Sequence, residues 1–273
     1  MKKHLPTIIL ISIFCIGLSL LLYPTLSDYW NSFHQSKAVA TYAEAVADID
    51  DERYETLWKD AVAYNQALAK TGVKWTLSDA EQAEYERQLN VTDSGIMAYI
   101  EIPKINCTLP IYHGTDEGVL QVAVGHLAGT SLPVGGESTH CVLSSHRGLP
   151  SAKLFTNLDQ LVAGDTFLIR TLDEVLTYEV DQILIVLPDE LDALQIVPGE
   201  DYCTLVTCTP YGINTHRLLV RGHRIETQST SQVRVTADAL QIEPFVVAPM
   251  IAVPILLLLL IWLLVSTRRK KKV

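Results

Sequence analysis

Long apolar segments stand near both ends of the chain. Leu5 to Tyr23 and Phe245 to Val265 contain no Asp, Glu, Lys or Arg. Each has about the 17 to 25 residues that a helix needs to cross the hydrocarbon of a bilayer. We therefore expect a transmembrane helix within residues 1–26 and another within residues 244–273. The part between them is long enough for one domain and an appendage.

The region after the first apolar segment, residues 27–94, has a helical pattern. Ser27 to Lys70 lacks Pro and Gly, and its apolar side chains recur every three to four residues, which predicts one or two helices. Gly72 suits the C-terminal cap of such a helix. A shorter helix is expected from Ser78 to Leu89, because Ser78 precedes Glu81 by the three residues of a capping box.

Residues 95–225 read as short β-strands separated by Gly and Pro. About seven strands at this spacing predict a barrel or a sandwich. One helix is expected among them, at Ser151 to Leu161, and residues 226–243 read as a polar stalk before the second apolar segment. The predicted strands are Ile96 to Ile102, Thr108 to Tyr112, Cys141 to Ser145, Thr166 to Thr171, Leu176 to Leu187, Tyr202 to Cys208 and His216 to Ile225.

The charges predict the orientation in the membrane. Seven of the 21 basic residues flank the apolar segments, at Lys2, Lys3 and residues 268–272, and short basic flanks stay on the cytoplasmic side. Both termini should then be cytoplasmic and the domain between them extracellular. That domain keeps 14 basic against 31 acidic residues, which argues against binding of nucleic acid or anionic lipid.

The first apolar segment also admits a second interpretation, as a cleaved signal peptide. Such a peptide needs a small-residue cleavage site directly after its apolar run. Pro24 to Asp28 supplies none, and the Ala-x-Ala at Ala38 to Ala40 lies too far along the chain. We favour a retained anchor; cleavage would leave the C-terminal anchor and the orientation unchanged.

Of the five cysteines, Cys208 has the sequence position that favours chemistry. Cys15 lies in the first apolar segment, and Cys208 ends a predicted strand just before a Pro/Gly turn, where a substrate can reach it. Cys107, Cys141 and Cys203 are embedded in other runs and read as small buried hydrophobic residues. A Cys107–Cys141 disulfide is the main alternative, since export permits disulfides.

A cysteine nucleophile needs a base or a cation nearby, and acyl transfer needs a donor for the oxyanion. His146 follows another predicted strand at a Gly/Pro turn, and Arg217 begins the strand after Cys208. Antiparallel pairing of the two strands around that turn would bring Arg217 beside Cys208. The sequence therefore predicts a Cys208, His146 and Arg217 site.

Three blocks resemble one known family. TLVTCTPYGINTHRLLVRGHR (Thr204 to Arg224) is similar to the signature of sortases, the extracellular cysteine transpeptidases of Gram-positive bacteria, and especially of the pilin-polymerising class C. Gly125 to Phe155 resembles the histidine region of that class, and Gly95 to Ile105 resembles its first barrel strand. The resemblance implies an eight-stranded β-barrel with helical additions, and the class shares a C-terminal membrane segment.

The resemblance also implies a reaction. Cys208 would be the nucleophile that attacks the Thr carbonyl of an LPXTG-like motif, His146 the general acid/base, and Arg217 the donor that steadies the tetrahedral intermediate. The thioester would pass to a lysine amine of the next pilin, without metal or cofactor. Attachment of surface proteins to peptidoglycan is the alternative reaction, and a non-catalytic anchored module is a third reading.

Other residues compete for these roles. His223 is a weaker choice of base, and His126, His140 and His216 read as packing or hydrogen-bonding residues. Arg221 is expected to support Arg217. Asn214 is either a turn residue or a partner that orients His146.

The sequence departs from class C in its lid. That class covers its site with a lid anchored by an Asp-Pro-aromatic motif, and no Asp-Pro precedes Asn90 here. Trp75 is the nearest aromatic residue, and Lys74 stands where an acidic residue is expected. We hypothesise a lid held by Trp75 without an anionic anchor.

Overall fold

The computed structural model describes residues 5–92, 94–227, 252–256, 258 and 261. The chain falls into two units, residues 1–30 with 230–273, and residues 31–229. Each unit is described by itself.

The first unit contains the N-terminal part of α1 (Leu5–Ala47). By its length and composition, this helix is apolar enough from Thr7 onward to cross a membrane, as its sequence predicts. At the other end of the chain, residues 252–256 are helical. Most of the predicted C-terminal membrane segment, and the predicted stalk after residue 227, lie outside the described residues.

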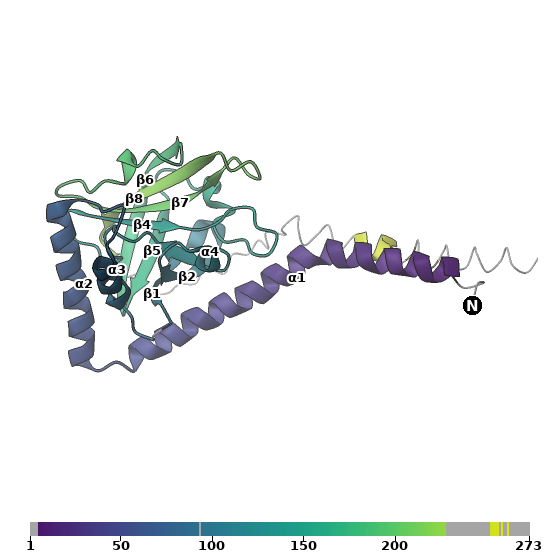
Figure 1. The fold of residues 1–273 in the computed structure, drawn as a ribbon, viewed down its shortest axis with the longest axis horizontal. Coiled ribbons are helices and arrows are strands. Elements are labelled where there is room, and N and C mark those ends of the chain that lie inside the picture. The colour runs from purple at the N-terminus through teal and green to yellow at the C-terminus, as the bar shows by residue number, and fades with distance from the viewer. Residues whose placement is uncertain (1–4, 93, 228–251, 257, 259–260, 262–273) are drawn as a thin grey trace, which may run out of the picture. The chain divides into compact units, whose positions relative to one another are not determined.

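The second unit begins with three helices, the rest of α1, α2 (Asp51–Thr71) and α3 (Asp79–Arg87), of which α2 and α3 lie on one side of the barrel (Figure 1). The Asp50 side chain accepts from the Arg53 N–H to begin α2, and Gly72 ends that helix with a φ of 80°. The capping box of Ser78 and Glu81 begins α3. These helix signals are confirmed.

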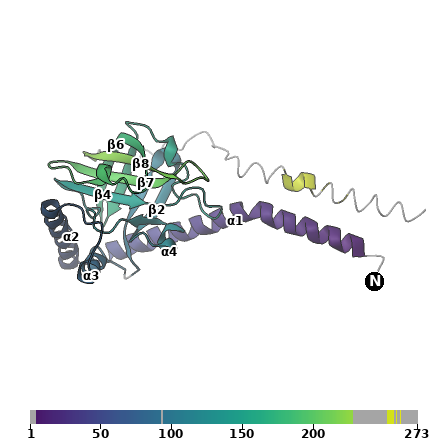
Figure 2. The same ribbon diagram turned by 45° about the horizontal axis from the view of Figure 1, so that its top comes forward.

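Eight strands form a closed barrel, which confirms the predicted fold class. Its order is β1-β2-β3-β4-β7-β8-β6-β5, and Figure 2 shows β6, β8, β7 and β4 beside one another. The β2–β3 and β4–β7 pairs are parallel, and the others are antiparallel. The strands are β1 (Ile96–Ile102), β2 (Cys107–His113), β3 (Val124–His126), β4 (Thr139–Ser144), β5 (Thr166–Thr171), β6 (Glu174–Val186), β7 (Asp201–Thr209) and β8 (His216–Ile225).

The barrel interior is one apolar core that the helices extend. Ile100, Ile102, Phe167 and Val220 are fully buried in it because successive side chains of a strand alternate between its two faces. The C-terminal part of α1 docks on this core through Tyr42, whose hydroxyl donates to the Met97 carbonyl (2.9 Å) and accepts from the Leu172 N–H (2.8 Å).

Two local expectations are wrong. β3 was missed because a three-residue strand is too short to show a period of two. The helix expected at Ser151 to Leu161 is a series of turns, with one 3-10 turn at Leu158–Gln160. Leu154 has a φ of 44°, outside the helical region, and the Phe155 N–H donates back to the His146 carbonyl at 3.1 Å.

Candidate active site

Cys208 and Arg217 are direct cross-strand neighbours. They are paired in the antiparallel register of β7 and β8, as the sequence predicts. Side chains paired in this way have their Cβ atoms about 4.5 to 5.5 Å apart and lie on the same face of the sheet. The Arg217 side chain therefore leaves the backbone directly beside Cys208.

The alternation along β7 and β8 places this pair on the outer face of the barrel. Leu205 and Leu218 are buried in the main core, whereas Val206 and Leu219 pack in a separate outer cluster. Cys208 lies two residues from Val206, and Arg217 lies two residues from Leu219, so both share the outer face. Cys208 is partly exposed there, which a nucleophile for a polypeptide substrate requires.

His146 reaches the same level from β4. In the parallel pairing of β4 and β7, Ser144 is opposite Val206, and the contact continues beyond the strand. The Ser145 N–H donates to the Val206 carbonyl at 3.1 Å, and the Thr207 hydroxyl donates to the Ser145 carbonyl at 2.8 Å. Continued to the next residue, this register sets the backbone of His146 level with that of Cys208, on strands about 4.8 Å apart.

Arg147 fixes the segment that follows His146. Its guanidinium pairs with Asp159 and donates to the Thr156 carbonyl at 3.1 Å and to the Thr209 hydroxyl at 3.4 Å. Thr209 adjoins Cys208, so one buried side chain ties the histidine segment to the end of β7. Sequence reasoning gave this residue no role.

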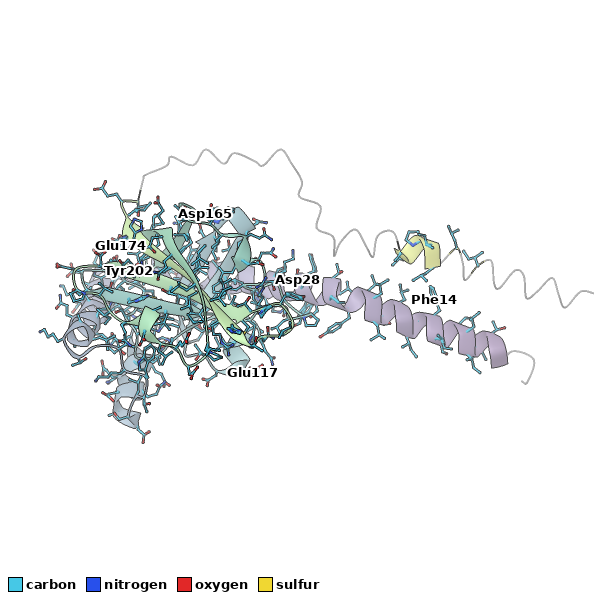
Figure 3. All side chains as sticks on the ribbon, turned by 90° about the horizontal axis from the view of Figure 1, so that it is seen from above. Phe14, Asp28, Glu117, Asp165, Glu174 and Tyr202 are labelled. Atoms are coloured by element: carbon cyan, nitrogen blue, oxygen red, sulfur yellow. The ribbon has the colours of Figure 1, made fainter. Side chains whose placement is uncertain are left out.

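Glu117 is a second residue that sequence reasoning missed. It begins α4 (Glu117–Leu120), and its Oε2 lies 3.5 Å from Nε2 of His146. The Gln121 amide donates to Oε1 at 2.9 Å, and this bond, followed by the charge of His146, lowers the pKa of Glu117. Figure 3 shows Glu117 well apart from Glu174, which begins β6. No motif marks Glu117, because the contact depends on folding β3 against β4.

A small apolar cluster lies on the outer face of the barrel. Val142, Val206, Leu219 and Leu184 come from the adjacent strands β4, β7, β8 and β6. Leu191 and Leu194, from the segment between β6 and β7, pack on them. Val142, Leu194 and Leu219 are buried, so this segment is held against the strands that carry Cys208 and Arg217.

Comparisons with known proteins agree with this geometry. A family model for the sortase domain matches residues 100–225. The chain is 53% identical to sortase C1 of Streptococcus agalactiae, with a TM-score of 0.68, and the match covers 69% of this chain and 98% of that structure. The chain belongs to the sortase family. The predicted resemblance is thus confirmed, and the protein is a cysteine transpeptidase.

Further relatives agree. Sortase C of Streptococcus pneumoniae, described in relation to catalysis and pilin substrate specificity, is 46% identical, with a TM-score of 0.63, and the match covers 69% of this chain and 96% of that structure. Sortase D of Bacillus subtilis strain 168 is 27% identical over 181 residues, which are 65% of this chain and 87% of that protein.

The other cysteines of the sortase are unsuited to catalysis. All five are free thiols, so the alternative of a Cys107–Cys141 disulfide is wrong. Cys141 and Cys203 are opposite each other in the register of β4 and β7, as free thiols in the barrel interior. Burial raises the pKa of Cys203 well above its ordinary value. The Sγ of Cys107 lies 3.9 Å from the Leu154 carbonyl oxygen, and burial raises the pKa of this thiol to about 12.

Two histidines are structural, as expected. Nδ1 of His140 lies 2.8 Å from the Gln195 carbonyl oxygen and Nε2 lies 2.7 Å from the Thr204 hydroxyl; burial lowers the pKa of His140 to about 4. Nε2 of His126 lies 2.9 Å from the Ser131 carbonyl oxygen and Nδ1 lies 3.0 Å from the Tyr85 hydroxyl.

Two more histidines compete poorly for the role of base. His223 is paired with Tyr202, six residues from Cys208 along β7, which is about 20 Å of strand. His216 is paired with Thr209, one position beyond the cysteine, and its Nδ1 lies 2.9 Å from the Thr215 hydroxyl.

The supporting roles expected of Arg221 and Asn214 change. Arg221 forms a two-bond ion pair with Asp181 (3.0 and 2.8 Å) and stacks over the Tyr202 ring, so it braces the barrel rather than Arg217. Asn214 has a φ of 62°, and its carbonyl accepts from Arg217 at 3.3 Å. Asn214 is thus a turn residue that holds Arg217, and Glu117 is the side chain beside His146.

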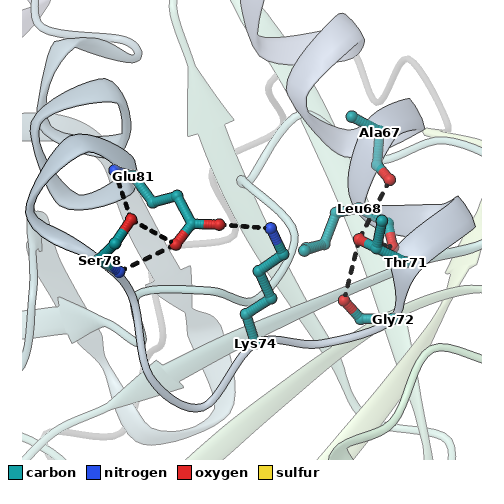
Figure 4. Close-up of polar contacts among 7 residues, drawn as sticks. All are labelled: Ala67, Leu68, Thr71, Gly72, Lys74, Ser78 and Glu81. Atoms are coloured by element: carbon teal, nitrogen blue, oxygen red, sulfur yellow. Dashed lines mark hydrogen bonds and ion pairs between the residues drawn. The ribbon is translucent and has the colours of Figure 1, made fainter.

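Lys74, one of the two predicted lid residues, is held by two contacts. Its N–H donates to the Gly129 carbonyl at 3.0 Å, and its ammonium pairs with Glu81 at 2.6 Å, as Figure 4 shows for the side chains. The Ser131 N–H, in the same loop as Gly129, donates to the His140 carbonyl. These contacts engage Lys74 away from Cys208 and Arg217, and a lid held by Trp75 stays a prediction.

Proposed function

We propose that this sortase builds covalent pili outside the cell. It would cleave an LPXTG-like sorting motif of one pilin and join the new carboxyl end to a lysine of the next. The pairing of Cys208 with Arg217 on the exposed outer face carries the proposal. The likeness to class C structures, one of them described with pilin specificity, favours pilins as substrates.

The first half of the reaction forms a thioester. The Cys208 thiolate attacks the Thr carbonyl of the motif, and the guanidinium of Arg217 donates to the oxyanion of the tetrahedral intermediate. His146 gives its proton to the Gly amine as the C–N bond breaks. The thioester retains the free energy of the cleaved peptide bond, so no nucleotide or metal is required.

The second half transfers the acyl group to an amine. The lysine amine attacks the thioester while His146 takes its proton, and collapse of the intermediate releases the Cys208 thiolate. An isopeptide bond has then replaced the peptide bond. Water must compete poorly for the thioester, and the apolar side chains of Val206 and Leu219 beside the site favour its exclusion.

The proposed location follows from the anchor. α1 is long and apolar enough to hold the sortase in the plasma membrane, and the basic residues at both ends of the chain favour cytoplasmic termini. The barrel would then face the exterior, where pilins or other surface proteins emerge.

A reconstitution tests the proposal. The full-length sortase in detergent is mixed with a pilin that carries an LPXTG-like motif, and intact mass spectrometry reads the acyl group on Cys208. We expect covalent pilin multimers joined by isopeptide bonds, which Cys208→Ala abolishes. A pilin whose acceptor lysines are replaced by Arg should stop at the thioester. An acyl-enzyme that is resolved only by a peptidoglycan amine would instead identify a wall-anchoring sortase.

A further inference from the structure

Glu117 and His146 come from distant segments that share one frame. α4 and β4 meet through β3, whose Gly125 is paired with Ser144. A Cβ on Gly125 would lie 2.3 Å from the Gly114 carbonyl oxygen, so the chain before α4 packs directly on β3. Gly at this position is therefore required by the close approach of two backbones.

Two hydrogen bonds continue this frame to the histidine. The Ala123 N–H donates to the Val119 carbonyl in α4 at 2.9 Å, and the Ala123 carbonyl accepts from the buried Ser145 hydroxyl at 2.7 Å. Ser145 directly precedes His146. The backbones that carry Glu117 and His146 are thus fixed relative to each other, although the Glu117 side chain itself is 72% exposed.

From this arrangement we propose that Glu117 is a positioning residue for His146, in a reaction that rests on the proposed transpeptidation. Its Oε2 lies 3.5 Å from Nε2 of the imidazole, while the Gln121 amide holds its other oxygen at 2.9 Å. A carboxylate at Nε2 favours a proton on that nitrogen and fixes the ring plane. Nδ1 is then the nitrogen that exchanges a proton with the departing and attacking amines.

The experiment compares variants of the full-length sortase in detergent. Glu117→Gln removes the charge at constant shape, Glu117→Asp keeps the charge on a shorter side chain, and Asp116→Asn is the matched control. Asp116 precedes Glu117 and makes no capping hydrogen bond, so its variant removes an equal charge from the same turn. Cleavage of a fluorogenic LPXTG-like peptide is followed from pH 5 to 10.

We expect Glu117→Gln to lower kcat/KM roughly two- to fivefold, the range that a largely exposed charge pair supplies. Glu117→Asp should recover part of the rate, and Asp116→Asn should leave the rate unchanged at every pH tested. Equal rates for Glu117→Gln and Asp116→Asn would overturn the proposal.

A second readout is independent of substrate. Nitrogen-15 shifts of the labelled histidines, assigned with His146→Ala, report which ring nitrogen of His146 carries the proton. The wild type should show the Nε2–H form and Glu117→Gln a mixture; an identical pattern in the two proteins would refute the proposed role. A tautomer change in an enzyme that cleaves no peptide would support the Glu117 contact while the proposed function failed.

Discussion

The barrel holds thiols near histidines in two regions, and only one has the access and the nearby cation that the proposed reaction needs. In the interior, Cys141 and Cys203 are paired across β4 and β7, close to His126. On the outer face, Cys208 lies beside Arg217 and at the level of His146. The interior thiols are buried, and the imidazole near them is fully hydrogen-bonded. A thiol near an imidazole therefore does not make an active site; access and a cation do.

The contrast arises within a single strand. Cys203 and Cys208 are five residues apart on β7, and an odd spacing places their side chains on opposite faces. One residue more or less between them would put both inside or both outside. The period of two in the backbone thus decides which cysteine is buried and which is accessible.

Replacing Cys208 or Cys203 by alanine, each in its own variant, should give the largest difference in activity between the two regions. Cys208→Ala should lower peptide cleavage by about 10⁴-fold or more, because no other group forms the acyl intermediate. Cys203→Ala should leave kcat within about twofold and lower the free energy of unfolding by about 1 to 2 kcal/mol through the small cavity it leaves. Initial rates and urea unfolding check the pair. Residual thioester formation in Cys208→Ala would show that a second thiol can serve.

The positive charge of Arg217 distinguishes the outer region around Cys208 from the interior region around Cys203. Arg217→Ala should lower kcat about 10²- to 10³-fold, as loss of an oxyanion donor does. Arg217→Lys should recover only a small part, since an ammonium lacks the planar fork. Single-turnover acylation measures the effect at the step that needs the donor.

Arg221→Ala is the matched control for Arg217. It removes an arginine from the same face of β8, but one that is engaged with Asp181. We expect a loss of stability with kcat retained. A drop in kcat as deep as that of Arg217→Ala would assign the donor role to both.

A buried histidine should make the barrel sensitive to acid. The pKa of His140 is lowered to about 4 by burial, against about 6.5 in the unfolded chain. Between these values the unfolded chain binds a proton that the folded chain excludes, so the free energy of unfolding falls as pH drops through this window. The loss should reach about 2 to 3 kcal/mol by pH 4.

Urea unfolding at pH 7 and pH 4.5 measures this loss, and His140→Gln, which can keep both hydrogen bonds, should reduce it. Burial also lowers the pKa of His113, which acts in the same direction. Burial raises the pKa of Asp201, which acts in the opposite direction because folding then favours its proton. His223→Gln, at a half-buried site on β8, should leave the acid sensitivity in place. An unchanged pH dependence in His140→Gln would contradict the assignment.

The strand pattern and the turns were enough to predict most of the barrel and the pairing of Cys208 with Arg217. The antiparallel return through Pro210 to Thr215 brings residues that are near in sequence together. The position of His146 at a strand end made it a candidate, but its approach to β7 could not be derived, since that contact depends on parallel pairing across more than 50 residues. Such a contact leaves no local signal.

Glu117 and the lid show where sequence patterns are insufficient. Glu117 reaches His146 because Gly125 permits close packing on β3, and nothing near Glu117 in the sequence records that contact. The lid hypothesis took Trp75 as the nearest aromatic residue in the expected region. The bond from the Lys74 N–H to the Gly129 carbonyl is likewise a contact between distant segments that no sequence pattern records, and the lid itself stays a prediction.

The smallest effect is expected from Trp75→Ala. Trp75 adjoins Lys74, whose N–H donates to the Gly129 carbonyl and whose ammonium pairs with Glu81, so we expect its removal not to expose the thiol. The rate of Cys208 alkylation by iodoacetamide, followed by intact mass, should stay within about twofold of the wild type, since surface changes away from a site have small effects. Tyr211→Ala is the contrasting variant, because the Tyr211 ring lies against Gly148, in the segment that follows His146. It should change the alkylation rate more than Trp75→Ala does, and the reverse order would restore the loop at Trp75 as a cover for the site.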